Sequence, residues 1–168
     1  MGRDTGSEGI EKAAVFLEER MEAFGIRPYF ESYRDTLANS KEIAFNVVGM
    51  LEGSDPGLKN EFIVIGAHYD HLGMGGPGSG SREPDTEAVH NGADDNASGV
   101  AGIIEIGEKI AANKDQLKRT VIVVAFGAEE MGLIGSKYFV EHPIIDMEDV
   151  VAMFNFDMIG RLSEEKSV

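Results

Sequence analysis

The sequence predicts an α/β domain of three layers, in which helices cover both faces of a mixed and largely parallel central sheet. Near-continuous apolar runs at 62–67, 120–126 and 149–156 are typical of strands that are buried on both faces. Segments with helical spacing alternate with these runs, which is the pattern of strand–helix–strand units. The length of 168 residues fits one domain, so we expect residues 1–168 to form a single unit.

Residues 5–24 have the apolar spacing of an amphipathic helix. Thr5 followed by Glu8 fits a capping box at its start, and Gly25 fits its end. The apolar positions on the expected buried face are Ile10, Ala13, Ala14, Leu17, Met21 and Phe24. The sequence therefore predicts a first helix over this range.

Further elements follow in alternation. Strands are expected at 29–35 and 42–52, before the first buried run. A glycine-rich loop at 73–92 comes after that run, and its G-x-G-x-x-G match lacks the helix that a dinucleotide site requires. Helices are expected at 97–112 and 133–142, the second ending before a proline. The buried strands are thus separated by helices, as a parallel inner sheet requires.

The composition excludes several kinds of partner and site. A formal net charge of −15 argues against nucleic acid and anionic membrane surfaces as partners. No apolar run approaches the roughly 18 residues of a membrane span, and the N-terminus lacks the apolar stretch of a signal peptide. The chain has no cysteine, which excludes thiolate sites. Any metal site is therefore expected to use imidazole and carboxylate groups.

Each of the three buried runs leads into side chains that can bind metal. His68 and Asp70 follow the first, Glu129 and Glu130 the second, and Asp157 the third. The carboxyl ends of parallel strands meet at one edge of a sheet, where α/β domains bind ligands. Two adjacent glutamates at a strand end repel each other, which raises a pKa unless a cation is present. Taken singly, a strand-end histidine or a solvated acidic turn would also explain these residues.

The segment 92–99 opens the helix expected at 97–112. Asp94, Asp95 and Asn96 exceed what capping of that helix needs, so a carboxylate here could bridge two metals. Two ions roughly 3.5–4 Å apart, sharing a carboxylate and a water, suit one histidine and three carboxylates. Ligation by nitrogen and oxygen without sulfur favours zinc, with cobalt or manganese as alternatives.

Four linked motifs give the chain a family resemblance. In order and approximate spacing the chain resembles the M28 family of zinc aminopeptidases, and its opening GRDTGSEG resembles the start of that catalytic domain. The motifs are GAHYDH at 66–71, NGADDNASG at 91–99, AEEMGLIGS at 128–136 and NFDMIGR at 155–161. The resemblance implies a zinc-exopeptidase fold over nearly the whole chain.

The resemblance also implies a set of metal ligands. His68 and Asp157 would hold one zinc and Glu130 the other, while Asp95 would bridge both ions. Asp95 is preferred to Asp94 because its distance to the Ser-Gly pair matches the family's bridging residue, which often precedes a cis peptide. Zinc, with two ions in a complete site, is the implied cofactor.

The remaining site residues take catalytic roles by the same resemblance. Glu129 would act as general base and acid, and Asp70 would orient His68. The implied reaction removes the N-terminal amino acid of a peptide by attack of activated water, so peptides are the implied partners. Relatives are often exported, which implies a periplasmic or extracellular location.

The chain departs from the family pattern at one ligand. The family's second zinc takes a histidine from far downstream of the Asp157 motif, and this chain ends at Val168. His71, His90 and His142 do not match that position, and His142 is expected at the surface. His71 and His90 flank the glycine-rich loop, where we expect solvated residues; the alternative is that one of them lies near the site and replaces the missing histidine. The sequence thus predicts a domain incomplete at its C-terminus, with impaired activity, one zinc or none, and self-association through an uncovered C-terminal side.

Two alternatives to the peptidase remain open. One is an acyltransferase similar to glutaminyl cyclases, which would use the same fold with one zinc. The other is a non-catalytic binding form of the fold. The paired Asp94 and Asp95 favour the peptidase over the cyclase. The intact set of metal-binding residues argues against the non-catalytic form for the parent protein, whereas the expected truncation argues for it in this chain.

Overall fold

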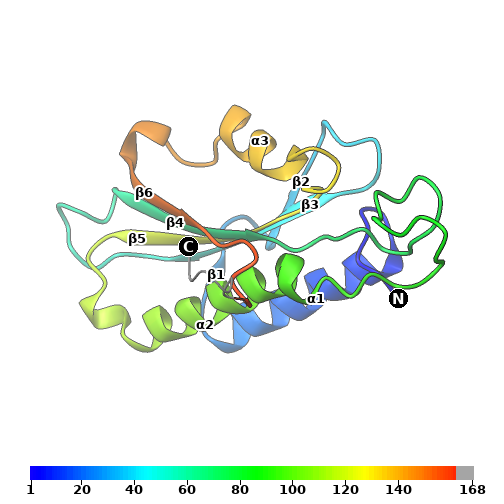
Figure 1. The fold of residues 1–168 in the computed structure, drawn as a ribbon. Coiled ribbons are helices and arrows are strands. Elements are labelled where there is room, and N and C mark those ends of the chain that lie inside the picture. The colour runs from blue at the N-terminus through cyan, green and yellow to red at the C-terminus, as the bar shows by residue number, and fades with distance from the viewer. Residues whose placement is uncertain (162–168) are drawn as a thin grey trace.

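A computed structural model of the chain describes residues 1–161, and residues 162–168 lie outside the description. A six-stranded sheet runs in the order β1-β3-β5-β4-β6, with β2 paired to β3. Helices α1 and α2 cover one face of the sheet and α3 covers the other (Figure 1). The bounds are α1 Glu8–Ala23, β1 Arg27–Pro28, β2 Arg34–Thr36, β3 Phe45–Leu51, β4 Phe62–His68, α2 Gly99–Ala112, β5 Thr120–Phe126, α3 Ile134–Glu141 and β6 Val150–Asn155, with a kinked turn at Ala93–Ser98 and short 3₁₀ turns at Lys114–Gln116 and Met147–Asp149.

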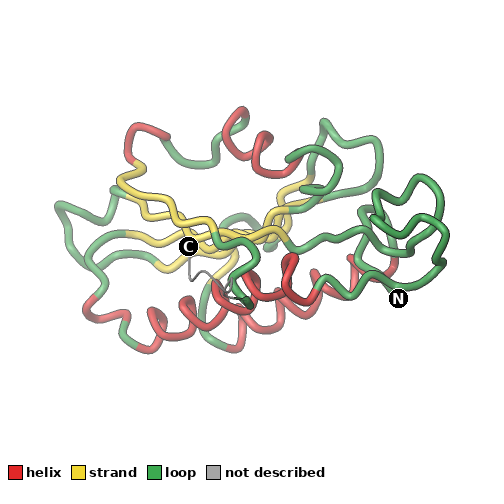
Figure 2. Tube along the Cα trace, in the orientation of Figure 1, coloured by secondary structure: helices red, strands yellow, loops and turns green. Residues whose placement is uncertain are grey.

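The sheet is mixed, as the sequence predicts. Strand β4 pairs in parallel with β5 and β6, whereas β3 pairs antiparallel with β5. Strands β1 and β2 add antiparallel pairs on the far side of β3. Figure 2 shows the strands as one layer between the helices, so the three-layer prediction is confirmed. The carboxyl ends of β4, β5 and β6 consequently meet at one edge, which is where the candidate site lies.

Apolar side chains on both faces of the sheet form the core. Leu17 and Met21 of α1 and Ile103 of α2 are fully buried against one face. On the other face Phe139 of α3 meets Phe126 of β5 edge-on, with ring centroids 5.8 Å apart. Burial of each such side chain contributes about 1.5–3 kcal/mol. The core thus fixes the sheet edge that carries the site.

The prediction of one continuous strand at 29–35 was wrong. The structure instead has β1 at Arg27–Pro28 and β2 at Arg34–Thr36, separated by bends. Pro28 has no N–H to continue a ladder. The hydroxyl of Tyr33 also donates to the carbonyl of Ile26 at 2.6 Å, which folds the segment back. A local side-chain bond therefore replaces a continuous strand.

The start of the first helix also differs from the prediction. Helix α1 begins at Glu8, and the Ser7 hydroxyl accepts the N–H of Ile10 at 3.2 Å. Thr5 is therefore not the cap. Ser7 fills the same role because a serine oxygen can accept an unpaired N–H of the first turn.

Strand β6 forms an edge of the described sheet and is largely exposed. Val151, Met153 and Phe154 are each about half exposed, so an apolar strand edge is present as expected. Self-association through it stays a prediction, because no second chain is present. Within residues 1–161, no helix has both the length and the apolar character of a membrane span.

Asn46 links β3 to the turn that follows β5. Its side-chain oxygen accepts the N–H of Gly127 at 3.1 Å, and its amide donates to the carbonyl of Gly135 at 3.1 Å. The side chain is fully buried, so water cannot replace these partners. Asn46 therefore holds both ends of the turn that carries the paired glutamates.

We expect Asn46→Ala to lower the free energy of unfolding by about 1–3 kcal/mol, because it leaves buried backbone groups unpaired. Chemical denaturation measures the change. The matched control is Asn39→Ala at an exposed position, where a change within about 0.5 kcal/mol is expected. Equal effects of the two substitutions would contradict the role of Asn46.

Candidate metal centre

His68 ends β4 and is the centre of a first group of possible ligands. The ring is 4% exposed, and its Nε2 lies 3.1 Å from an Asp95 oxygen and 3.6 Å from an Asp157 oxygen. The other nitrogen, Nδ1, lies 3.2 Å from the carbonyl oxygen of Asp70, which can only accept. Nδ1 therefore carries the hydrogen, and Nε2 is left free to face the carboxylates.

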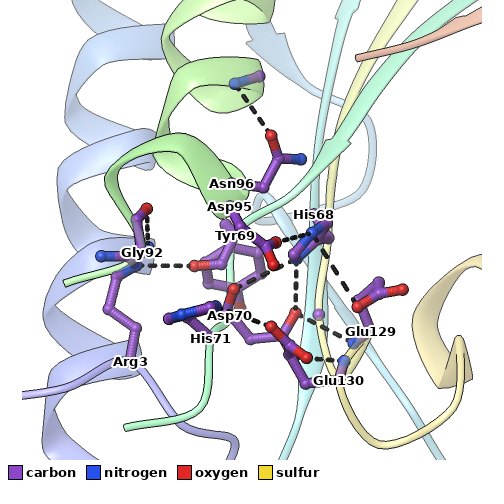
Figure 3. A network of polar contacts seen from close by, with 12 residues as sticks. Arg3, His68, Tyr69, Asp70, His71, Gly92, Asp95, Asn96, Glu129 and Glu130 are labelled. Carbon is purple, nitrogen blue, oxygen red and sulfur yellow. Dashed lines mark hydrogen bonds and ion pairs between the residues drawn. The ribbon is translucent and has the colours of Figure 1, made fainter. Parts of the chain in front are cut away.

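A second group of possible ligands lies beside the first and shares Asp95 with it. His71, Asp95 and Glu130 each offer one atom, and these atoms lie within 4.8 Å of one another. His71 Nδ1 is 2.7 Å from a Glu130 oxygen. The expectation that His71 is solvated is wrong, because the residue is only 8% exposed. Figure 3 shows His68 and His71 with Asp95 and Glu130 at this edge of the sheet.

The Asp70 carboxylate positions the two glutamates. Its two oxygens accept the backbone N–H groups of Glu129 at 3.0 Å and of Glu130 at 3.1 Å. One of these oxygens also lies 3.6 Å from His68 Nδ1. Asp70 is fully buried. It therefore ties the end of β4 to the turn after β5, a role that its position in the sequence does not reveal.

The kinked turn at Ala93–Ser98 places Asp95 next to the segment that follows β6. The peptide bond between Asp95 and Asn96 is cis, as the family resemblance implies. The buried Asn96 side chain donates to the carbonyl of Phe156 at 2.9 Å and accepts the N–H of Met158 at 3.2 Å. These two partners flank Asp157. Asn96 thus fixes the position of Asp157 relative to Asp95.

Arg3 joins two segments beside the site, a role that the sequence pattern did not indicate. Its guanidinium donates to three backbone carbonyls, those of Tyr69 at 3.1 Å, Asn91 at 2.9 Å and Gly92 at 3.1 Å. The segment after β4 and the segment before Asp95 are therefore joined through Arg3 (Figure 3). Only the similarity of residues 2–9 to the start of the family domain could have pointed to it.

The remaining sequence candidates lie outside both ligand groups. Instead of joining either group, Asp94 accepts the N–H of Gly160 with one oxygen at 2.8 Å. His90 is partly buried, with its ring centroid 6.0 Å from that of His71. His142 is exposed, as expected. The arrangement supports the preference for Asp95 over Asp94.

The carboxylates change the protonation of the site. Burial alone would lower the pKa of His68, but the carboxylates of Asp70, Glu129 and Asp157 outweigh it and raise that pKa to about 9. Burial raises the pKa of Glu129, and repulsion from Glu130 adds to this effect although His68 opposes it. The protein without metal thus uses a proton on His68 to offset the negative charge.

A divalent cation fits this donor set. Within residues 1–161, no lysine or arginine lies within ion-pair distance of Asp95, Glu129, Glu130 or Asp157, whose partners at that distance are imidazole rings. Carboxylates gathered without such partners require a cation or protons. Imidazole nitrogens and carboxylate oxygens in these numbers suit zinc among the common metals.

Most of the chain matches a known protein family. Residues 46–168 match the model described as peptidase family M28. The chain belongs to peptidase family M28. All the residues of the two ligand groups, and Glu129, lie inside the matched range.

Individual relatives agree with this membership. The chain is similar to leupeptin-inactivating enzyme 1 of Streptomyces exfoliatus, with 28% identity over 94% of the chain and 31% of that protein. It is also similar to the probable lipoprotein aminopeptidase LpqL of Mycobacterium tuberculosis, with 30% identity over 70% of the chain and 20% of that protein. This M28 chain therefore spans at most about a third of the length of these curated relatives.

Solved structures show the same fold. A Zn-dependent exopeptidase from Parabacteroides distasonis superposes with a TM-score of 0.71 at 20% identity, covering 95% of this chain and 56% of that one. A glutaminyl cyclase from Tannerella forsythia gives 0.70 at 21% identity, covering 95% and 57%. The M28 fold of this chain is therefore shared by proteins of two reaction classes.

The raised pKa of His68 predicts how stability depends on pH in protein stripped of metal. A folded pKa of about 9 against an ordinary 6.5 gives stability that is fully present below pH 6.5 and is lost as pH rises through 9. The loss is on the order of 3 kcal/mol, at about 1.4 kcal/mol per pKa unit. Denaturant unfolding between pH 6 and 10 measures it.

The control for this measurement is the exposed His142. His142→Gln should keep the pH dependence, whereas His68→Gln should remove the loss of stability near pH 9, because the imidazole whose pKa is raised to about 9 is gone. A stability of the unsubstituted protein that stays flat across this range would show that His68 is not charged.

Proposed function

We propose that this chain carries the metal centre of a zinc-dependent aminopeptidase. The observation that carries the proposal is that two ligand groups share Asp95, while Glu129 lies beside them and belongs to neither. Its nearer oxygen is 4.0 Å from His68 Nε2. A site with metal ligands and one carboxylate held apart suits hydrolysis by activated water.

Each residue then has a separate task. His68, Asp157 and Asp95 would hold one zinc, and Asp95 and Glu130 would contribute to a second. Bound zinc would polarise the substrate carbonyl and lower the pKa of a water molecule. Glu129 would take a proton from the attacking water and pass it to the leaving amine. In the protein without metal, burial raises the pKa of Glu129, and bound cations beside it would lower that pKa again.

A cavity beside the site leaves room for part of a peptide. A cavity of about 160 Å³ is bordered by Glu129 and Asp157 and by the apolar side chains of Leu133 and Met153. It adjoins the proposed base, so we infer that it takes an apolar side chain of the substrate. A leucine-anilide is therefore a suitable test substrate.

Glutaminyl cyclase chemistry is the second candidate, because such cyclases share the fold. The second ligand group favours the peptidase, since a resemblance to the cyclases implies a centre with one zinc. Release of leucine from leucine-anilide, compared with pyroglutamate formation from a peptide that begins with glutamine, separates the two. Pyroglutamate as the only product would overturn the peptidase proposal.

Glu129→Gln tests the catalytic assignment. The amide keeps the size of the side chain but cannot accept the proton, so hydrolysis of leucine-anilide should fall by about 100-fold or more. Zinc content, measured by elemental analysis, should stay at the level of the unsubstituted protein. Glu141→Gln at the exposed end of α3 is the matched control and should leave both quantities unchanged.

Two results would count against this assignment. Loss of zinc from a folded Glu129→Gln protein would make Glu129 a ligand instead of the base. Full hydrolysis with zinc retained would place the base elsewhere.

A further inference from the structure

We propose that His71 is a ligand of the second metal ion, together with Asp95 and Glu130. The family resemblance assigns the histidine of that ion to a position far downstream, and it gives His71 no role. The inference rests on the metal centre of the proposed function and adds one ligand to it. It turns a histidine expected on the surface into part of the site.

The distances suit a shared ion. His71 Nδ1 lies 2.7 Å from a Glu130 oxygen, and both atoms lie within 4.8 Å of an Asp95 oxygen. Ligand atoms at about 2.0–2.2 Å from a tetrahedral zinc are about 3.3 Å from each other. Small side-chain shifts would therefore bring all three groups onto one ion, without a change in the backbone.

The backbone and its neighbours hold the imidazole in place. The N–H of His71 donates to the carbonyl of Arg3 at 3.0 Å, and the side chain is only 10% exposed. Gly92 lies against the ring with a φ of +56°, and a Cβ there would stand 2.7 Å from the ring atoms Cγ and Cδ2. Glycine is thus required at position 92 both for its backbone conformation and for the space that the ring occupies. The ring position is fixed before any ion binds.

The site also leaves room for further ligands. A cavity of about 610 Å³ is bordered by His71 and Glu130 and reaches the surface near Asp4 and Glu42. Water or a substrate group can reach an ion held by His71, Asp95 and Glu130 from this side. An open position of this kind is what a catalytic zinc needs.

A different role for His71 has to be separated from ligation. The imidazole could simply donate a hydrogen bond that orients Glu130, which would make it a positioning residue. His71→Asn distinguishes the two roles, because the asparagine amide nitrogen occupies nearly the place of Nδ1. It can still donate to Glu130, but a neutral amide nitrogen does not bind zinc.

The experiment is calorimetric titration of zinc into metal-stripped protein, with elemental analysis of the bound zinc. The unsubstituted protein should bind two ions. His71→Ala and His71→Asn should both bind one, or bind the second more than about 100-fold more weakly, a loss beyond that of an outer-shell partner. His90→Asn, beside His71 but outside both ligand groups, is the matched control and should bind two. Thermal unfolding confirms that each variant is folded.

The outcomes separate this inference from the proposed function. Retention of the second ion in His71→Asn, with loss in His71→Ala, would make His71 a positioning residue and overturn the inference. A second ion unaffected by either substitution, or a single ion lost only in His68→Asn, would also overturn it and leave the zinc centre standing. Absence of any zinc from the unsubstituted protein would overturn both proposals.

Discussion

Mutual repulsion of carboxylates is the constraint on which the site depends. Asp95, the pair Glu129 and Glu130, and Asp157 come from three separate segments, yet the sheet brings them to one edge beside His68 and His71. Charges at this separation in a partly buried site oppose folding unless something neutralises them. In the protein alone a proton on His68 does so in part. The core of the three-layer fold must therefore supply the free energy that holds these groups together until a cation binds.

Hydrogen bonds between side chains and backbone groups hold most of the site together. Asp70 accepts two amides of the turn after β5, Asn96 bonds to both neighbours of Asp157, and Arg3 joins two loops through three carbonyls. Each contact satisfies a polar group that is otherwise costly to bury. The side chains that would bind metal consequently make none of these supporting contacts. Ligands and supports are separate sets of residues, although they alternate along the sequence.

The sequence predicts the fold and the strand-end residues because both follow from short-range patterns. Apolar runs locate β4, β5 and β6, and the polar residues that end them must meet where parallel strands end. The roles of His71 and Asn96 could not be predicted in this way. Burial of His71 depends on Gly92 and Arg3, which are distant in sequence, and Asn96 resembles a helix cap until its contacts with Phe156 and Met158 are known. The break between β1 and β2 likewise depends on Tyr33, whose bond to Ile26 leaves no periodic signal.

Both ligand groups draw their members from segments that the fold alone brings together. The end of β4 and the segment after it supply the histidines, the kinked turn at Ala93–Ser98 supplies Asp95, and the segments after β5 and β6 supply the rest. In the unfolded chain only His68 and His71 of these ligands, with Asp70 between them, stay close together through the sequence, so a metal ion would bind the native state more tightly than the unfolded one. Any species that binds only the native state shifts the folding equilibrium in proportion to the logarithm of its free concentration. Zinc bound at the proposed centre would therefore also protect the polypeptide from proteolysis, because it lowers the population of the unfolded state.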